Sequence, residues 1–208
     1  MLLFTMHSMR KLSSLVLLTG LMRLAAADKV VGGPLVVNAT GRTATVVWVV
    51  ESGGANLQSQ DGSETHSAPT LRSESVRFTG LKAGTSYQYT VPGHDDLKGT
   101  FKTAPAPGSG FEFVVYGDTR TRHDVHRKVI ASILANSHPD FVVQTGDLVN
   151  DGDDPALWPI FFDLERELLR KVAFYPALGN HERHSRNYSD FMQAPPMTVY
   201  YYSAPVDQ

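Results

Sequence analysis

The second half of the chain alternates apolar runs with segments of helical periodicity. The runs at 111–118, 140–147 and 172–180 are short and mostly apolar, which is typical of buried strands. Between them, residues 124–136 and 155–171 repeat apolar positions at the spacing of one helix face. The order strand–helix–strand–helix–strand predicts a parallel sheet with right-handed crossovers, an α/β unit of βαβαβ type.

Residues 30–107 follow a different pattern, of short apolar segments separated by Gly and Asn turns. We predict strands over 43–50, 73–81, 85–91 and 97–104. Strands at this spacing favour an antiparallel β-sandwich. The stretch TAPAPGSG (103–110) is rich in proline and glycine and predicts a short linker. The pattern therefore predicts an all-β domain over residues 28–107 and an α/β part over 111–208.

One stretch of the all-β part is more specific. GLKAGTSYQYTV, residues 80–91, resembles the tyrosine corner of fibronectin type III domains. The resemblance implies that the Tyr87 hydroxyl bonds back to the backbone and that Trp48 packs in the core between two sheets. A ligand-binding platform formed by Trp48 and Tyr87 is the alternative.

The first 27 residues have the order of an export signal. Arg10 and Lys11 precede the apolar stretch 12–22, and small residues follow up to Ala27. The serine, threonine and arginine residues of this segment disfavour a stable membrane span. We predict a signal peptide cleaved after Ala27 and a secreted or periplasmic protein.

Composition excludes several kinds of chemistry and of partner. The 208-residue chain has no cysteine, so disulfides, thiolate metal sites and cysteine nucleophiles are excluded. A formal net charge of −2 indicates no surface for nucleic acid or for an acidic membrane. No feature of the sequence indicates an oligomeric state.

Polar residues that can bind metals follow each of the three predicted parallel strands. Asp118 ends the first, Asp147 the second, and Asn180 with His181 the third. Ligands bind beyond the carboxyl ends of strands in an open parallel sheet, and neighbouring strands lie about 4.8 Å apart. A single Gly-Asp pair is typical of a turn or helix cap, but three such strand ends in succession favour one site.

The donor types suggest the metal and the reaction. Carboxylate, amide oxygen and imidazole suit Zn, Mn or Fe. A carboxylate on the middle strand can bridge two metals about 3.5–4 Å apart, which is the arrangement for in-line displacement at phosphorus. We therefore expect two metal ions, of Fe, Zn or Mn, and a phosphate-ester substrate.

The motifs GDTR, GDLVNDG and GNHE together resemble those of calcineurin-like metallophosphoesterases. The all-β part ahead of them is similar to that of purple acid phosphatases and their bacterial relatives. The resemblance implies a hydrolase that activates hydroxide for attack on a phosphate ester. It implies that Asp118 binds the first metal, Asp147 bridges both metals and Asn180 binds the second. It also implies that His181 stabilises the transition state and assists the leaving group, with Glu182 orienting His181 or capping the next element.

The sequence departs from the family pattern at two positions. Position 120 is arginine where the pattern Asp-x-His has a histidine ligand, and Asn150 stands where purple acid phosphatases have a tyrosine. Asn150 or His126 is a candidate to fill the gap, although a capping or solvated role is favoured for His126. Arg120 is a candidate partner for a substrate phosphate.

The last histidine of the sequence is His184. The family that the motifs resemble has two or three further histidines beyond the third motif. We therefore expect a fragment or truncated product that holds about half of a metallophosphoesterase domain. The alternative is a catalytically inactive exported protein that serves binding or attachment and has a degenerate metal site.

Overall fold

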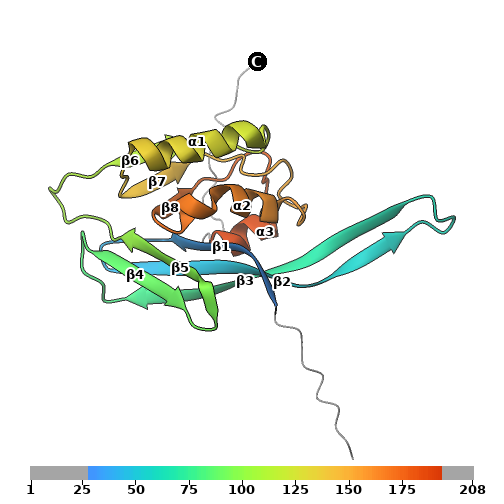
Figure 1. The fold of residues 1–208 in the computed structure, drawn as a ribbon, viewed down its shortest axis with the longest axis horizontal. Helices are drawn as coiled ribbons and strands as arrows, with labels where there is room; N and C mark the ends of the chain where they lie inside the picture. Colours follow the sequence, from blue (N-terminus) through green and yellow to red (C-terminus); the bar gives the residue numbers. More distant parts are fainter. Residues whose placement is uncertain (1–27, 194–208) are drawn as a thin grey trace, which may run out of the picture.

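The computed structural model describes residues 28–193. The predicted signal peptide, residues 1–27, lies outside this part, as do residues 194–208. The described residues form a six-stranded mixed sheet, a two-stranded sheet and three helices (Figure 1). None of these helices is long and apolar enough to cross a membrane.

The predicted βαβαβ unit is present. Strands β6 (Phe113–Tyr116), β7 (Phe141–Gln144) and β8 (Ala173–Pro176) pair in parallel, with β7 in the middle. Helices α1 (His123–Asn136) and α2 (Trp158–Leu169) form the crossovers. A short helix, α3 (Arg186–Phe191), follows β8 and was not predicted. The strands are shorter than the apolar runs because each run continues into the loop that leaves the sheet.

Three of the five strands of the all-β part extend the same sheet. The bounds of all five are β1 (Lys29–Val37), β2 (Thr43–Gln58), β3 (Thr65–Thr79), β4 (Ser86–Val91) and β5 (His94–Lys102). The order in the large sheet is β3-β2-β1-β8-β7-β6, and β1 meets β8 in parallel at Val36 and Ala173. Strands β4 and β5 form the separate hairpin.

The all-β and α/β parts are also joined outside the large sheet. The backbone N–H of Thr100 on β5 donates to the carbonyl of Arg170 at 2.8 Å, just after α2. Lys102 forms an ion pair with Asp140 at 2.6 Å. The described residues therefore form one mixed α/β fold, and the fibronectin type III-like sandwich with its boundary near residue 107 stays a prediction.

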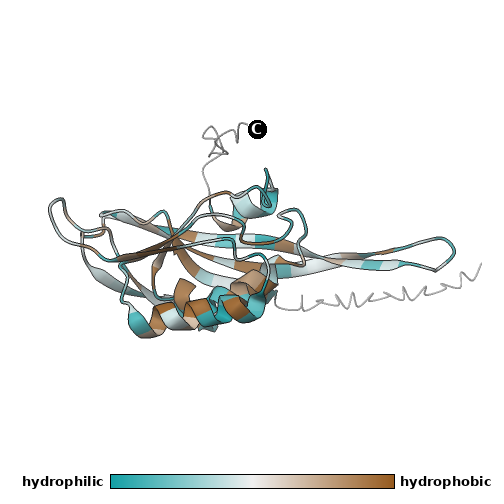
Figure 2. Cartoon of the chain, turned by 90° about the horizontal axis from the view of Figure 1, so that it is seen from above, coloured by the Kyte–Doolittle hydropathy of each residue, from teal (hydrophilic) through white to brown (hydrophobic). Residues whose placement is uncertain are grey.

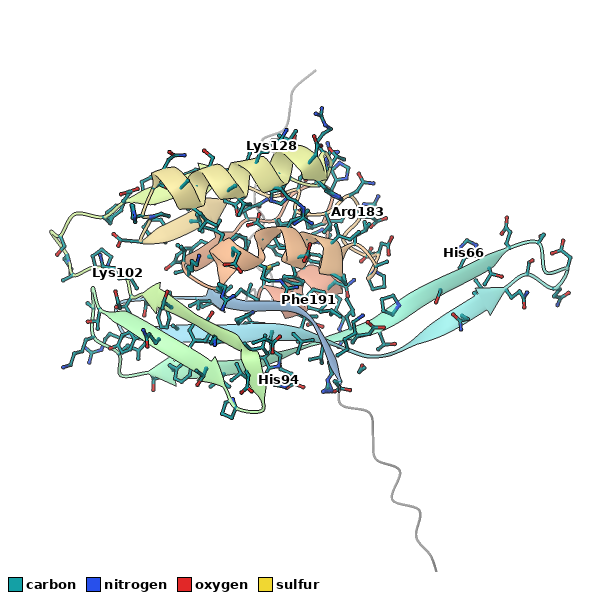
Figure 3. The ribbon with its side chains drawn as sticks, in the orientation of Figure 1. His66, His94, Lys102, Lys128, Arg183 and Phe191 are labelled. Carbon is teal, nitrogen blue, oxygen red and sulfur yellow. The ribbon has the colours of Figure 1, made fainter. Side chains whose placement is uncertain are left out.

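The main core lies between α2 and the sheet and is rich in aromatic rings. Trp158 and Phe162 on α2 are fully buried and contact Phe191 on α3, which Figure 3 labels. The Trp158 indole donates to the carbonyl of Gly152 at 2.9 Å, so its polar atom is satisfied. The tryptophan expected in the core, Trp48, is only half-buried on β2 and belongs to neither apolar cluster. The expectation that Trp48 packs in the core was therefore wrong.

The Tyr87 hydrogen bond is confirmed. Its hydroxyl oxygen accepts the backbone N–H of Lys82 at 2.9 Å, five residues upstream. The ring stacks on Phe101 of β5 with ring centroids 5.7 Å apart. The contact closes the turn before β4, as a tyrosine corner does.

Strands β2 and β3 run beyond the body as a long hairpin arm, residues 51–72 (Figure 1). Pairing continues out to Gln58 and Thr65, and most of the arm is exposed. Figure 2 shows mainly pale and teal residues along it. The arm was not predicted, because backbone pairing holds it and its side chains have no alternating apolar face.

Candidate metal centre at the strand ends

The structure brings the three predicted strand ends together. The backbone N–H of Asp118 donates to the carbonyl of Gly146 at 3.0 Å, which joins the loops after β6 and β7. The backbone N–H of His181 donates to Oδ1 of Asp147 at 3.2 Å, which joins the loops after β7 and β8. Arg183, labelled in Figure 3, lies in the third loop. Asn180 is exposed in the same loop, next to His181.

Both aspartates have a left-handed backbone. The φ angles are 54° at Asp118 and 58° at Asp147. A residue other than glycine in this region is strained by about 1–3 kcal/mol and persists only where its surroundings fix it. Such strain at two neighbouring strand ends is typical of functional loops.

Glu182 is the residue that fixes the second of these loops. Its buried carboxylate accepts backbone N–H groups from Asp147 at 2.9 Å, Leu148 at 2.7 Å, Val149 at 3.1 Å and Gly179 at 2.9 Å. We expected Glu182 to orient His181 or to cap the next element, and the structure gives its side chain neither role. Four charge-assisted hydrogen bonds instead hold the loops after β7 and β8 in one arrangement.

Two glycines permit the close approach of these loops. A Cβ atom at Gly179 would overlap the backbone nitrogen and Oδ1 of Asp147. One at Gly146 would lie 2.7 Å from the Cα of Gly179, and the φ angle of Gly146 is 103°. A side chain at either position would push the two loops apart.

The orientation of His181 comes from a backbone group. Its Nδ1 lies 2.7 Å from the carbonyl oxygen of Asn150. Since a carbonyl only accepts, Nδ1 carries a proton, and Nε2 is the atom available for chemistry. Asn150, considered above as a substitute ligand, contributes this carbonyl to the site.

Arg120 lies between the two aspartates. Its Nε is 3.3 Å from Oδ1 of Asp118 and 3.4 Å from Oδ2 of Asp147. The Asp147 side chain is 17% exposed and that of Arg120 28%, whereas that of Asp118 is 74% exposed. The arginine expected as a partner for phosphate therefore pairs with two of the candidate metal ligands.

His126 is buried between α1 and α2. Its Nε2 is 2.6 Å from Glu165 of α2, and both side chains are buried. The other Glu165 oxygen accepts from the Tyr116 hydroxyl at 2.7 Å. Burial, and then the Glu165 carboxylate, raise the pKa of Tyr116 well above its usual value. Neither expectation for His126, ligand or solvated cap, is correct, because the ring is packed between α1 and α2.

The donors fit part of a metal site. Asp118, Asp147 and Asn180 offer carboxylate and amide oxygens, which suit divalent ions such as Mn²⁺ or Zn²⁺. Within residues 28–193, however, no three His, Cys, Asp or Glu side chains are grouped as metal ligands. The described residues thus supply carboxylate oxygens from two strand ends, together with a guanidinium that contacts both.

Comparison with known proteins agrees with this geometry. The sequence model of the calcineurin-like phosphoesterase family matches residues 111–207. A search of curated proteins finds no match. The fold is similar to that of purple acid phosphatase PPD1 from yellow lupin (Lupinus luteus) seeds, with a TM-score of 0.51 and 16% identity. The similarity covers 72% of this chain but only 35% of the lupin chain. Residues 111–207 are therefore similar in sequence to calcineurin-like phosphoesterases, and the chain shares part of its fold with a purple acid phosphatase.

Proposed function

We propose that this chain belongs to a metal-dependent phosphoesterase, with phosphate esters as substrates. The observation that carries the proposal is the meeting of Asp118, Asp147 and the Asn180–His181 pair at the ends of three adjacent parallel strands. These residues lie in the stretch that matches the phosphoesterase family. The fixed backbone around them supports a site that is organised before substrate binds.

The proposed ligand roles follow the positions of the strands. Asp118 would bind one metal, Asn180 a second, and Asp147, in the loop after the middle parallel strand β7, would bind both. A metal pair supplies a hydroxide nucleophile at neutral pH and neutralises charge on the phosphoryl oxygens. The hydrogen bond from the backbone N–H of His181 to Oδ1 of Asp147 helps to fix the carboxylate that would bind both metals.

His181 is proposed as the general acid. Its Nδ1–H is held by the carbonyl of Asn150, which leaves Nε2 to carry the proton that is transferred. When the bond from phosphorus to the leaving oxygen breaks, this proton passes to that oxygen, and an alcohol and a phosphate are released. The neutral imidazole then regains a proton from solvent.

A second candidate function is a catalytically inactive binding or attachment protein. The observation in its favour is the pairing of Arg120 with Asp118 and Asp147. If that pairing is permanent, the carboxylates are not available to metal.

The test combines metal content with hydrolysis of an aryl phosphate. Purified chain, Asp147→Asn and His181→Ala are each dialysed against Mn²⁺ or Zn²⁺ and analysed for bound metal and released phenolate. We expect Asp147→Asn to lose most of the metal and His181→Ala to keep it while losing turnover. Equal metal content in Asp147→Asn and the unchanged chain contradicts the proposal and favours the inactive protein.

A further inference from the structure

We propose that the Arg120 guanidinium is an internal cation that competes with metal at the strand-end site and so sets its metal affinity. This inference rests on the proposed function, because it assumes that Asp118 and Asp147 are metal ligands. It concerns a residue at which this chain departs from the Asp-x-His pattern.

The first argument is geometric. A single atom, Nε of Arg120, lies within 3.4 Å of carboxylate oxygens from two different strand ends. A metal shared by these carboxylates would need the same oxygens, at about 2.0–2.2 Å. Guanidinium and metal therefore cannot both occupy the space between the two aspartates.

The second argument is electrostatic. Two aspartates and one arginine carry a summed charge of −1, whereas the aspartates alone carry −2. An incoming divalent ion meets less negative charge and is repelled by the arginine. Arginine keeps its proton at all ordinary pH values, so only movement of the side chain can remove this repulsion.

The third argument concerns how firmly each group is held. Oδ1 of Asp147 already accepts the backbone N–H of His181. Oδ2 accepts a hydrogen bond from Nε of Arg120. The nearby Glu182 carboxylate has four backbone donors of its own, so it does not compete for the arginine. Asp147 is therefore held in place with one oxygen committed to the guanidinium.

The consequence is a graded set of metal affinities. Arg120→Ala removes the competing cation, and Arg120→His also offers a nitrogen donor. Arg120→Lys keeps the charge. Arg122→His is the matched control, because Arg122 is exposed and its only recorded ion pair in the described part is with Asp124.

The experiment titrates the metal-free chain and each variant with Mn²⁺, following bound ion by electron paramagnetic resonance. We expect Arg120→His to bind the first Mn²⁺ about tenfold or more tighter than the unchanged chain, in the range by which neighbouring groups tune metal sites. Arg120→Ala should show a smaller gain, and Arg120→Lys and Arg122→His no gain. Adding Asp147→Asn to Arg120→His should abolish the gain.

A second measurement, the melting temperature with and without Mn²⁺, tests the inference even if a variant is less stable than the unchanged chain. Without metal, Arg120→Ala leaves two neighbouring carboxylates without their shared cation and should melt at a lower temperature than the unchanged chain. Saturating Mn²⁺ should then raise its melting temperature more than that of the unchanged chain. Equal increases in both would overturn the inference.

The results separate this inference from the proposed function. If Asp147→Asn weakens Mn²⁺ binding but Arg120→His and Arg120→Ala do not strengthen it, the inference is wrong and the metal site stands. If Asp147→Asn has no effect in either background, the metal site itself is wrong.

Discussion

Oε2 of Glu182 accepts the backbone N–H of Asp147 at 2.9 Å, across 35 residues of sequence. The same oxygen accepts the N–H of Gly179 at 2.9 Å, while Oε1 serves the two residues after Asp147. One buried carboxylate thus holds the loops after β7 and β8 together. The backbone of the candidate ligand Asp147 is among the groups that this carboxylate holds.

Replacement of Glu182 should therefore destabilise the fold strongly. Glu182→Gln keeps the shape but loses the charge and turns an amide NH₂ toward backbone donors. We expect a loss of about 2–4 kcal/mol in the free energy of unfolding, measured by urea denaturation. Glu167→Gln is the control, since Glu167 is 52% exposed and its ion pairs within the described part of the chain are with Arg170 and Lys171, and it should change stability by less than about 0.5 kcal/mol. Similar losses in both variants would contradict the role of Glu182.

Loss of the Tyr87 hydroxyl should have a smaller effect. Tyr87→Phe removes the hydrogen bond from the backbone of Lys82 and should cost on the order of 1 kcal/mol in urea unfolding of the full chain. Mn²⁺ binding should not change, because Tyr87 lies in the all-β part. Gln88→Ala, at the exposed neighbouring position, is the control. An unfolding midpoint equal to that of the unchanged chain would argue against a structural role for the hydroxyl.

Alkaline pH should destabilise the protein through its buried tyrosines. Burial raises the pKa of Tyr89, and burial together with Glu165 raises that of Tyr116. The folded state keeps protons that the unfolded state releases, so this stability is complete below about pH 10 and declines as pH rises above it. We expect a shallower decline in Tyr116→Phe, measured as unfolding free energy between about pH 10 and pH 12. An identical slope in both proteins would show that Tyr116 contributes nothing to it.

Export processing is the last prediction. The charged, apolar and then alanine-rich order of residues 1–27 predicts a mature chain that begins at Asp28. N-terminal sequencing of material secreted by an expressing bacterium tests this directly. Secreted protein that still begins at Met1 would contradict it.

The sequence by itself determined the order of strands and helices in the α/β part of this protein. The apolar runs and helical periodicities of residues 111–180 predicted three strands and two crossovers in the observed order. They also predicted that Asp118, Asp147 and His181 would meet, because parallel strands bring their carboxyl ends to one edge. The Tyr87 hydrogen bond was likewise local, spanning five residues.

The tertiary structure decided which partner each polar group has. Arg120 faces two aspartates, Glu182 takes four backbone donors, and His126 is buried against Glu165. It also decided that β1 continues the sheet beside β8, so that the two predicted parts share one sheet. Periodicity shows which residues are apolar and at what spacing, but a polar side chain's partner depends on contacts between segments far apart in the chain. The Glu182–Asp147 bond forms only when two loops, each following its own strand, reach the same edge of the sheet.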